Sequence, residues 1–220
     1  MMLLAFAARP LAAQEVVHDD VVEYQIHTAG SGSERFVASK PAAIPQGIAT
    51  FGPFRVIDGA RAALVDVTDA RSPAAFTRMM QAWPGIALIE MIDCPGTEDD
   101  LANLRLGRMI RAAGISTYVP AGGSVRSGGV ELFLAGAHRY ADAGAEFAVH
   151  AWMDEDGREA NDYAVTAPEN RKYLDYYRQM GMTEAEARAF YAMTNSVPHH
   201  EARWFDGTEM AGWVRLDEAA

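Results

Sequence analysis

The sequence predicts an α/β fold in which a mostly parallel sheet is covered by helices. From residue 54 onward, apolar runs of strand length alternate with segments of helical periodicity. Strands that alternate with helices pair in parallel, because each helix carries the chain back across the sheet. The 220 residues are enough for one domain with a substantial core.

The elements of this domain follow one another in a regular order. The helix predicted for residues 98–114 has the clearest pattern, because apolar residues recur at helical spacing, acids begin it and Gly114 ends it. Thr183 and Glu186 have capping-box spacing at the start of a later helix. We predict strands at 61–68, 85–93, 115–119 and 145–152, helices at 72–83, 98–114, 128–141, 169–181 and 183–193, and a turn, short helix and edge strand within 199–217.

The first 53 residues differ from the rest. Residues 1–14 combine a short apolar run with small residues, which is typical of a truncated secretory signal without its basic start. This segment favours a periplasmic or secreted protein, with a cytoplasmic protein as the alternative. The run is shorter than the roughly 20 apolar residues that cross a bilayer, so we expect no membrane span. Residues 15–53 predict an irregular N-terminal extension, and residues 54–217 form the predicted domain.

Composition excludes some classes of function. The formal net charge of -11 argues against nucleic acid as a partner, because phosphate binding needs a clustered positive surface. The single cysteine, Cys94, cannot close an intramolecular disulfide and is expected to be buried.

The stretch AGGSVRSGGVELFLAGAHRY, residues 121–140, places two serines before an apolar helical run. A serine at a helix N-terminus beside small residues has amide donors that can stabilise an oxyanion and space for a substrate carbonyl. It can equally be an ordinary N-cap, and local spacing does not choose between Ser124 and Ser127. A nucleophilic serine needs a base, and His150, at the end of the strand that follows, is the candidate.

A second candidate wall of the site is IDCPGTEDD, residues 92–100. Here a strand end is followed by Pro95, Gly96 and Thr97, and then by the start of a helix with free amides. These amides can bind an oxyanion, but the stretch can also be an ordinary turn closed by Pro-Gly.

Taken together, MIDCPGT, LRLGRMIRAAGISTYVPAGG, SGGVELFLAGAHRY and AEFAVHAW resemble the core of the Clp protease proteolytic subunit and the wider Clp/crotonase superfamily, including uncharacterised exported bacterial members. The resemblance covers roughly residues 54–217 and implies repeated ββα units. It selects Ser127 over Ser124, because the family's serine lies nine residues before the glycine that closes its helix. It implies Ser127 as nucleophile, His150 as general base, and amides near Gly96 or Thr97 and at Gly128 as the oxyanion site.

Two positions depart from the family pattern. Thr97 stands where the family has the second glycine of its oxyanion turn, and a side chain there can narrow the site. Counted without gaps, the family's third triad position falls on Ala202. Glu201 is the nearest carboxylate and becomes the expected partner of His150, with Asp206 and Asp162 as further candidates.

Other constellations of residues are weaker. Some relatives pair serine with lysine, but neither Lys40 nor Lys172 falls where that base is expected. The adjacent His199 and His200 make a poor chelating pair, so we expect no metal and no cofactor. The sequence thus predicts a peptidase-like serine hydrolase, possible homo-oligomers, and a peptide or other acyl substrate. The alternative is an inactive binding or assembly module on the same fold.

Overall fold

The computed structural model describes residues 40–218 and contains two sheets. The larger sheet has six strands in the order β1-β2-β3-β4-β6-β8. The pairs β3·β4, β4·β6 and β6·β8 are parallel, whereas β1 and β2 add an antiparallel edge. Its strands are β1 Ala49–Phe51, β2 Phe54–Val56, β3 Arg61–Leu64, β4 Leu88–Met91, β6 Ser116–Val119 and β8 Arg139–Ala141.

The smaller sheet has four strands in the order β10-β9-β7-β5. The pairs β5·β7 and β7·β9 are parallel, and β10 pairs antiparallel with β9 at the edge. Its strands are β5 Asp93–Cys94, β7 Ser124–Arg126, β9 Glu146–Val149 and β10 Arg203–Asp206.

Each parallel strand of the smaller sheet directly follows a strand of the larger one. The order β4-β5-α2 and β6-β7-α3 therefore repeats a ββα unit, and β8-β9 begins a third. The predicted α/β class, with repeated ββα units and a mostly parallel sheet covered by helices, is confirmed. The single strand expected at 85–93 is corrected: the chain changes sheets at Ile92, whose amide bonds to Leu64 and whose carbonyl bonds to Ser124.

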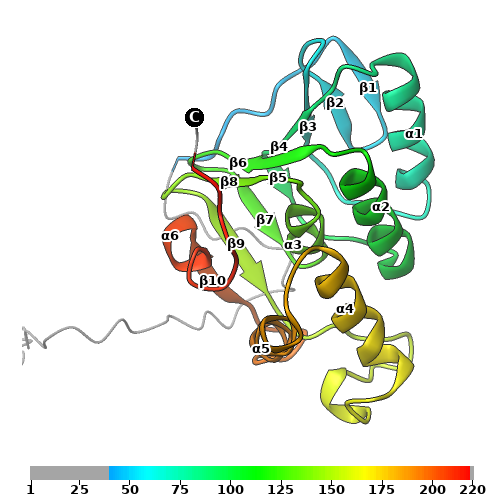
Figure 1. The fold of residues 1–220 in the computed structure, drawn as a ribbon, viewed down its shortest axis with the longest axis vertical. Helices are drawn as coiled ribbons and strands as arrows, with labels where there is room; N and C mark the ends of the chain where they lie inside the picture. Colours follow the sequence, from blue (N-terminus) through cyan, green and yellow to red (C-terminus); the bar gives the residue numbers. More distant parts are fainter. Residues whose placement is uncertain (1–39, 219–220) are drawn as a thin grey trace, which may run out of the picture.

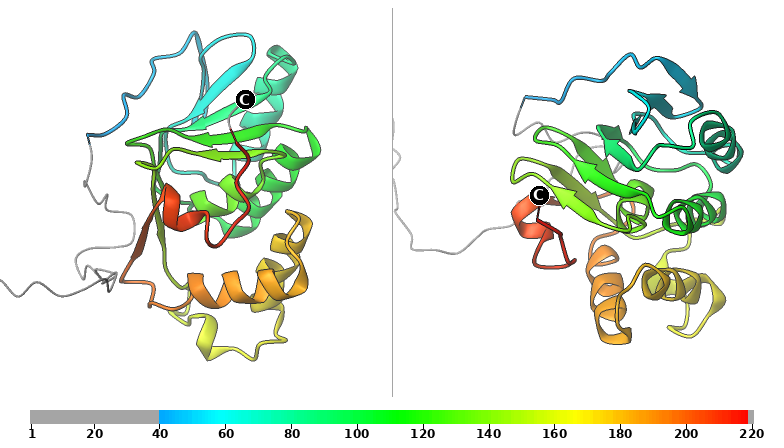
Figure 2. Two further views of the ribbon diagram at one scale, coloured as in Figure 1. Left: turned by 60° about the vertical axis from the view of Figure 1, so that its left-hand side comes forward. Right: turned by 45° about the horizontal axis from the view of Figure 1, so that its top comes forward.

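Helices cover the sheets on one side and extend beyond them at one end. Helices α1 and α2 pack together along one side of the molecule, whereas α4 and α5 form a separate pair at the far end from α1 (Figure 1, Figure 2). The core between sheets and helices is apolar and includes fully buried Phe54, Phe133 and Phe147. The helices are α1 Ser72–Ala82, α2 Asp100–Ala112, α3 Gly128–Leu134, α4 Pro168–Gln179, α5 Glu184–Thr194 and α6 Gly207–Met210, with a 3₁₀ turn at Ala160–Asp162.

The helix predicted for residues 128–141 is half as long as expected, because α3 ends at Leu134 and the chain continues as β8. Thr117 explains the early end. Its Oγ1 donates a 2.8 Å hydrogen bond to the Phe133 carbonyl. A Cβ on Gly136 would lie 2.2 Å from Thr117 Oγ1. The chain therefore turns against β6 and joins the larger sheet.

The C-terminal elements agree with the expected types. Thr183 and Glu186 form the predicted capping box at the start of α5. The closing segment contains an edge strand and a short helix, but β10 precedes α6. The signal-like residues 1–14 lie outside the described residues, and β1 joins the sheet a few residues before the domain start expected at 54. Within residues 40–218, no helix is long and apolar enough to span a bilayer.

Candidate active site

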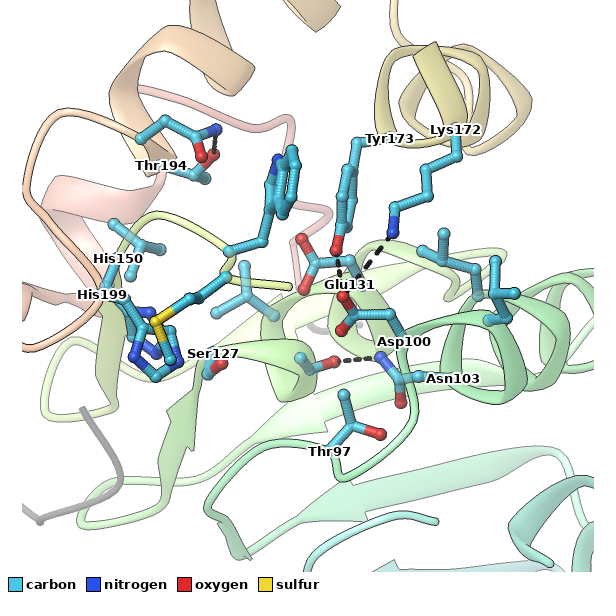
Figure 3. A pocket seen from close by; sticks show the side chains of 18 of the residues that line it. Thr97, Asp100, Asn103, Ser127, Glu131, His150, Lys172, Tyr173, Thr194 and His199 are labelled. Carbon is cyan, nitrogen blue, oxygen red and sulfur yellow. Dashed lines mark hydrogen bonds and ion pairs between the residues drawn. The ribbon is translucent and has the colours of Figure 1, made fainter. Parts of the chain in front are cut away.

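A pocket of about 550 Å³ lies where the carboxyl ends of β7 and β9 meet the N-termini of α2 and α3. The α4 and α5 helices close its far side, because Tyr173, Tyr177 and Tyr191 also line it. Figure 3 shows Ser127 beside His150 and His199 at one end, and Glu131 near Asp100 and Lys172 at the other. The pocket thus brings together loops and helices that are far apart in the sequence.

Ser127 directly follows β7 and precedes the first residue of α3. Its backbone has φ 48° and ψ -128°, and it is the one non-glycine residue with positive φ in the described range. Such a conformation costs roughly 1–3 kcal/mol and persists where the surroundings hold it. Here the Ser127 amide donates a 2.9 Å hydrogen bond to Ala148 in β9.

The Ser127 side chain does not act as a helix cap. It makes no capping hydrogen bond, and its Oγ has no hydrogen-bond partner among residues 40–218. Ser124, by contrast, is fully buried and accepts a 2.7 Å hydrogen bond from Arg126. Of the two serines, Ser127 alone lines the pocket.

Backbone amides surround Ser127. Gly96 has φ +132°, and a Cβ there would lie 3.5 Å from Ser127 Oγ, so its main chain passes close to the hydroxyl. Within the described part of the chain, the amides of Gly96, Thr97 and Gly128 donate no hydrogen bond. Free donors beside a hydroxyl are the arrangement that stabilises a developing oxyanion.

Thr97 does not direct its hydroxyl at these amides. Its Oγ1 lies 3.2 Å from the carbonyl of Thr68 and 3.1 Å from the amide of Asp99, and thus bonds to the main chain. Its methyl group packs toward Gly128, where an added Cβ would lie 2.6 Å away. The Thr97 side chain, where the family pattern has glycine, therefore fills space beside Gly128.

Asn103 holds this turn in place, although Asn103 is not among the site residues expected from the sequence. Its Nδ2 donates a 2.7 Å hydrogen bond to the Gly128 carbonyl, and its Oδ1 accepts a 2.8 Å bond from Thr68 Oγ1. The side chain is 2% exposed. The sequence signal that could have identified it is an asparagine one turn into an amphipathic helix, on its buried face.

His150 follows β9 and is next to Ser127 across the sheet. The register pairs Arg126 with Ala148, so the two chains leave the sheet side by side. His150 Nδ1 lies 2.8 Å from the Ala151 carbonyl. A carbonyl only accepts, so Nδ1 carries the proton and Nε2 holds a free lone pair. Burial, and secondarily His199, lowers the pKa of His150, so the ring is neutral at pH 7.

Ser127 and His150 line one pocket without a hydrogen bond between their side chains in this structure. His199 completes this end: its ring meets His150 edge-on at 4.7 Å between centroids, and its amide bonds to Glu159. From the sequence, His199 is expected only as part of a poor chelating pair with His200. In the described part of the chain, no cluster of three or more histidine, cysteine or acidic side chains could hold a metal.

The carboxylates expected to orient His150 lie elsewhere. Glu201 Oε1 is 3.8 Å from His200 Nε2, and Glu201 does not line the pocket. Asp206 caps α6, and Asp162 accepts a hydrogen bond from the Glu159 amide. The Ala151 carbonyl, and not Glu201, makes the hydrogen bond with His150 Nδ1.

Two further acids and a lysine line the other end of the pocket. Glu131 is 8% exposed, and burial raises its pKa to about 7. Tyr177 donates a 2.8 Å hydrogen bond to its Oε1. The Lys172 ammonium lies 3.8 Å from Asp100, so this lysine, expected away from the site, is in the same pocket but ion-paired. A single acid within the apolar run of residues 128–137 was the available signal for Glu131.

Comparisons with known proteins give little beyond this geometry. No family model matches the sequence. No curated protein matches it either. A similar solved structure is that of the 1510-N membrane-bound stomatin-specific protease, a mutant in complex with a substrate peptide, at 15% identity and a TM-score of 0.45. The match covers 69% of this chain and 74% of that chain.

Proposed function

We propose that the protein is a serine hydrolase that cleaves an acyl bond, of the peptidase type. The observation that carries the proposal is Ser127, which has a positive φ, an unbonded hydroxyl and free amides around it. The sequence resemblance to the Clp/crotonase superfamily supports a peptide as the substrate. The rival proposal, a binding or assembly module, shares the fold but needs no reactive serine.

In the proposed mechanism, Ser127 Oγ bonds to the substrate carbonyl carbon while His150 Nε2 takes the hydroxyl proton. The amides of Gly96, Thr97 and Gly128 stabilise the oxyanion that forms. The carbon–nitrogen bond then breaks, and His150 gives its proton to the leaving amine. Water attacks the acyl-serine in the same way, with His150 again as base, and releases the acid.

The Ala151 carbonyl supports the base in this mechanism. It fixes the Nδ1–H tautomer and accepts a hydrogen bond from the imidazolium that forms, as a triad carboxylate does elsewhere. A neutral carbonyl stabilises that cation less than a carboxylate does. A slow hydrolase is the expected result.

Labelling with a fluorophosphonate probe tests the proposal, because an activated serine displaces fluoride from phosphorus. Wild-type protein should label, and Ser127→Ala and His150→Ala should each slow labelling by at least about a thousandfold. Glu201→Gln is the matched control for the orienting role and should label like wild type. Lys172→Met, in the same pocket, should do so as well.

Two results would contradict the proposal. Folded wild-type protein that does not label in any oligomeric form would favour the binding module. Labelling lost in Lys172→Met but kept in His150→Ala would assign the base to the lysine.

A further inference from the structure

The charges of the pocket are strongly unbalanced. Six carboxyl side chains line it, and Lys172 is the one lysine or arginine among its lining residues. The carboxyl groups are those of Glu98, Asp99, Asp100, Glu131, Asp154 and Glu155. An acidic lining raises the local concentration of cations and disfavours anionic substrates.

Glu131 contributes to this lining a carboxyl oxygen, Oε2, that accepts no hydrogen bond from another residue in the described range. Tyr177 bonds to Oε1, but Oε2 has no hydrogen-bond partner in the described range, although the residue is 8% exposed. Asp100 faces it closely enough to raise the pKa of Glu131 further. Oε2 is not among the buried side-chain atoms of residues 40–218 that lack a hydrogen-bond partner, so it is open to the pocket. Two facing carboxyl groups repel each other, and a cation between them would relieve that repulsion.

Lys172 shows how an ammonium fits this end of the pocket. Its Nζ lies 5.3 Å from the ring centroid of Trp152 and 5.0 Å from that of Tyr173, with the Asp100 carboxylate 3.8 Å away. Aromatic faces and a carboxylate together form a favourable environment for a cation. The chain's own lysine thus occupies part of a cation site.

Two apolar side chains are also exposed at this pocket, beside the exposed acids Glu98 and Glu155. Leu101 and Met153 line the pocket and remain 68% and 45% exposed. Exposed apolar side chains next to carboxylates suit a ligand with an alkyl stem and a cationic end.

We propose that this pocket selects peptides with a lysine or arginine side chain, whose cationic end lies between Asp100 and Glu131. The proposal rests on the proposed function in that both use the same pocket. It adds a substrate class: basic peptides.

Isothermal titration calorimetry tests the substrate class without catalysis, on Ser127→Ala protein, which cannot cleave the ligand. The two probes are acetyl-Ala-Ala-Lys-methylamide and its norleucine analogue, which differ only in the terminal ammonium. The lysine peptide should bind about tenfold tighter at pH 8, where Glu131 is ionised, because charge-assisted hydrogen bonds are the strong ones.

A second substitution locates the preference. In Ser127→Ala/Glu131→Gln, the advantage of lysine should fall to less than about threefold, since one charge partner is lost. Ser127→Ala/Asp66→Asn removes an exposed carboxylate that does not line the pocket, and it should keep the full preference.

Equal or tighter binding of the norleucine peptide would overturn the proposal. So would binding of neither peptide, or a lysine preference that Glu131→Gln leaves unchanged. A failure here is separate from a failure of the hydrolase proposal, because fluorophosphonate labelling reports on Ser127 whatever side chain the pocket prefers.

Discussion

Ser127 holds a backbone conformation that residues with a side chain rarely adopt, and its neighbours explain how it is held. The β9 carbonyl of Ala148 accepts its amide proton, and Gly96 leaves room for its hydroxyl. In this conformation Oγ makes no capping hydrogen bond to the start of α3.

Glu131 gives a pH dependence of stability that can be measured. Its pKa is about 7 in the folded protein, against 4.5 for a free glutamate. The folded state therefore binds the proton more tightly, and this stabilisation is complete below pH 4.5 and lost as the pH rises through 7. Between these limits, the stability of wild type relative to Glu131→Gln should fall by about 3 kcal/mol.

Urea unfolding of both proteins at several pH values measures this difference, and other titrating groups cancel in it. A difference that stays constant with pH would show that folding leaves the pKa of Glu131 unshifted, and one that grows as the pH rises would show that folding lowers it.

How far the site could be predicted depends on the kind of interaction. Chain order places His150 at a strand end, but the choice of Ser127 over Ser124 needed the family resemblance, because local spacing leaves both serines open. The hydrogen bond between His150 Nδ1 and the Ala151 carbonyl was not predictable. It depends on the turn after β9, and any residue at position 151 would supply the same carbonyl. Asn103 and Lys172 act through contacts between helices that periodicity does not specify.

At the scale of elements, the fold depends on consecutive strands that belong to different sheets, as β4 and β5 do. Residues 85–93 form one mainly apolar run, yet they contribute to both sheets as β4 and β5. Hydropathy gives the run but not the bend, because both halves are buried. The strand and helix types were predictable, whereas the early end of α3 depends on Thr117, which is remote in sequence.

Three helices meet at Gly107 of α2, which predicts a sensitive position. A Cβ there would lie 1.9 Å from the Tyr176 hydroxyl of α4, which donates a 2.6 Å hydrogen bond to the Glu131 carbonyl of α3. Gly107→Ala should therefore destabilise the protein by about 1–3 kcal/mol, despite the better helix propensity of alanine.

Chemical denaturation measures this loss. Arg105→Ala, on the exposed face of the same helix, is the control and should change stability by less than about 0.5 kcal/mol. A Gly107→Ala protein as stable as wild type would mean that α4 can shift away from α2 freely.

At the scale of the whole molecule, the pocket lies between two layers, the smaller sheet and the α4–α5 helix pair. The ends of β7 and β9 place Ser127 and His150 in the pocket, and the α4 and α5 pair supplies the opposite wall. Helix α1 lies far from this boundary (Figure 2). Anything that fills the pocket therefore joins the two layers.

A phosphonyl group attached to Ser127 should slow amide hydrogen exchange in α4 and α5, by at least about threefold in the amides facing the pocket. Exchange in α1 should not change. Mass spectrometry of labelled and unlabelled protein checks this pattern, and equal slowing in α1, α4 and α5 would mean that the adduct stiffens the entire fold instead.

The Ala151 carbonyl also has a consequence for how such a site changes over generations. A carboxylate in the orienting position can be removed by one codon change, but a peptide carbonyl is present whatever amino acid the codon specifies. In the proposed mechanism, substitution of Ser127 or His150 removes a reacting group directly, whereas the third position has no side chain that a substitution could remove.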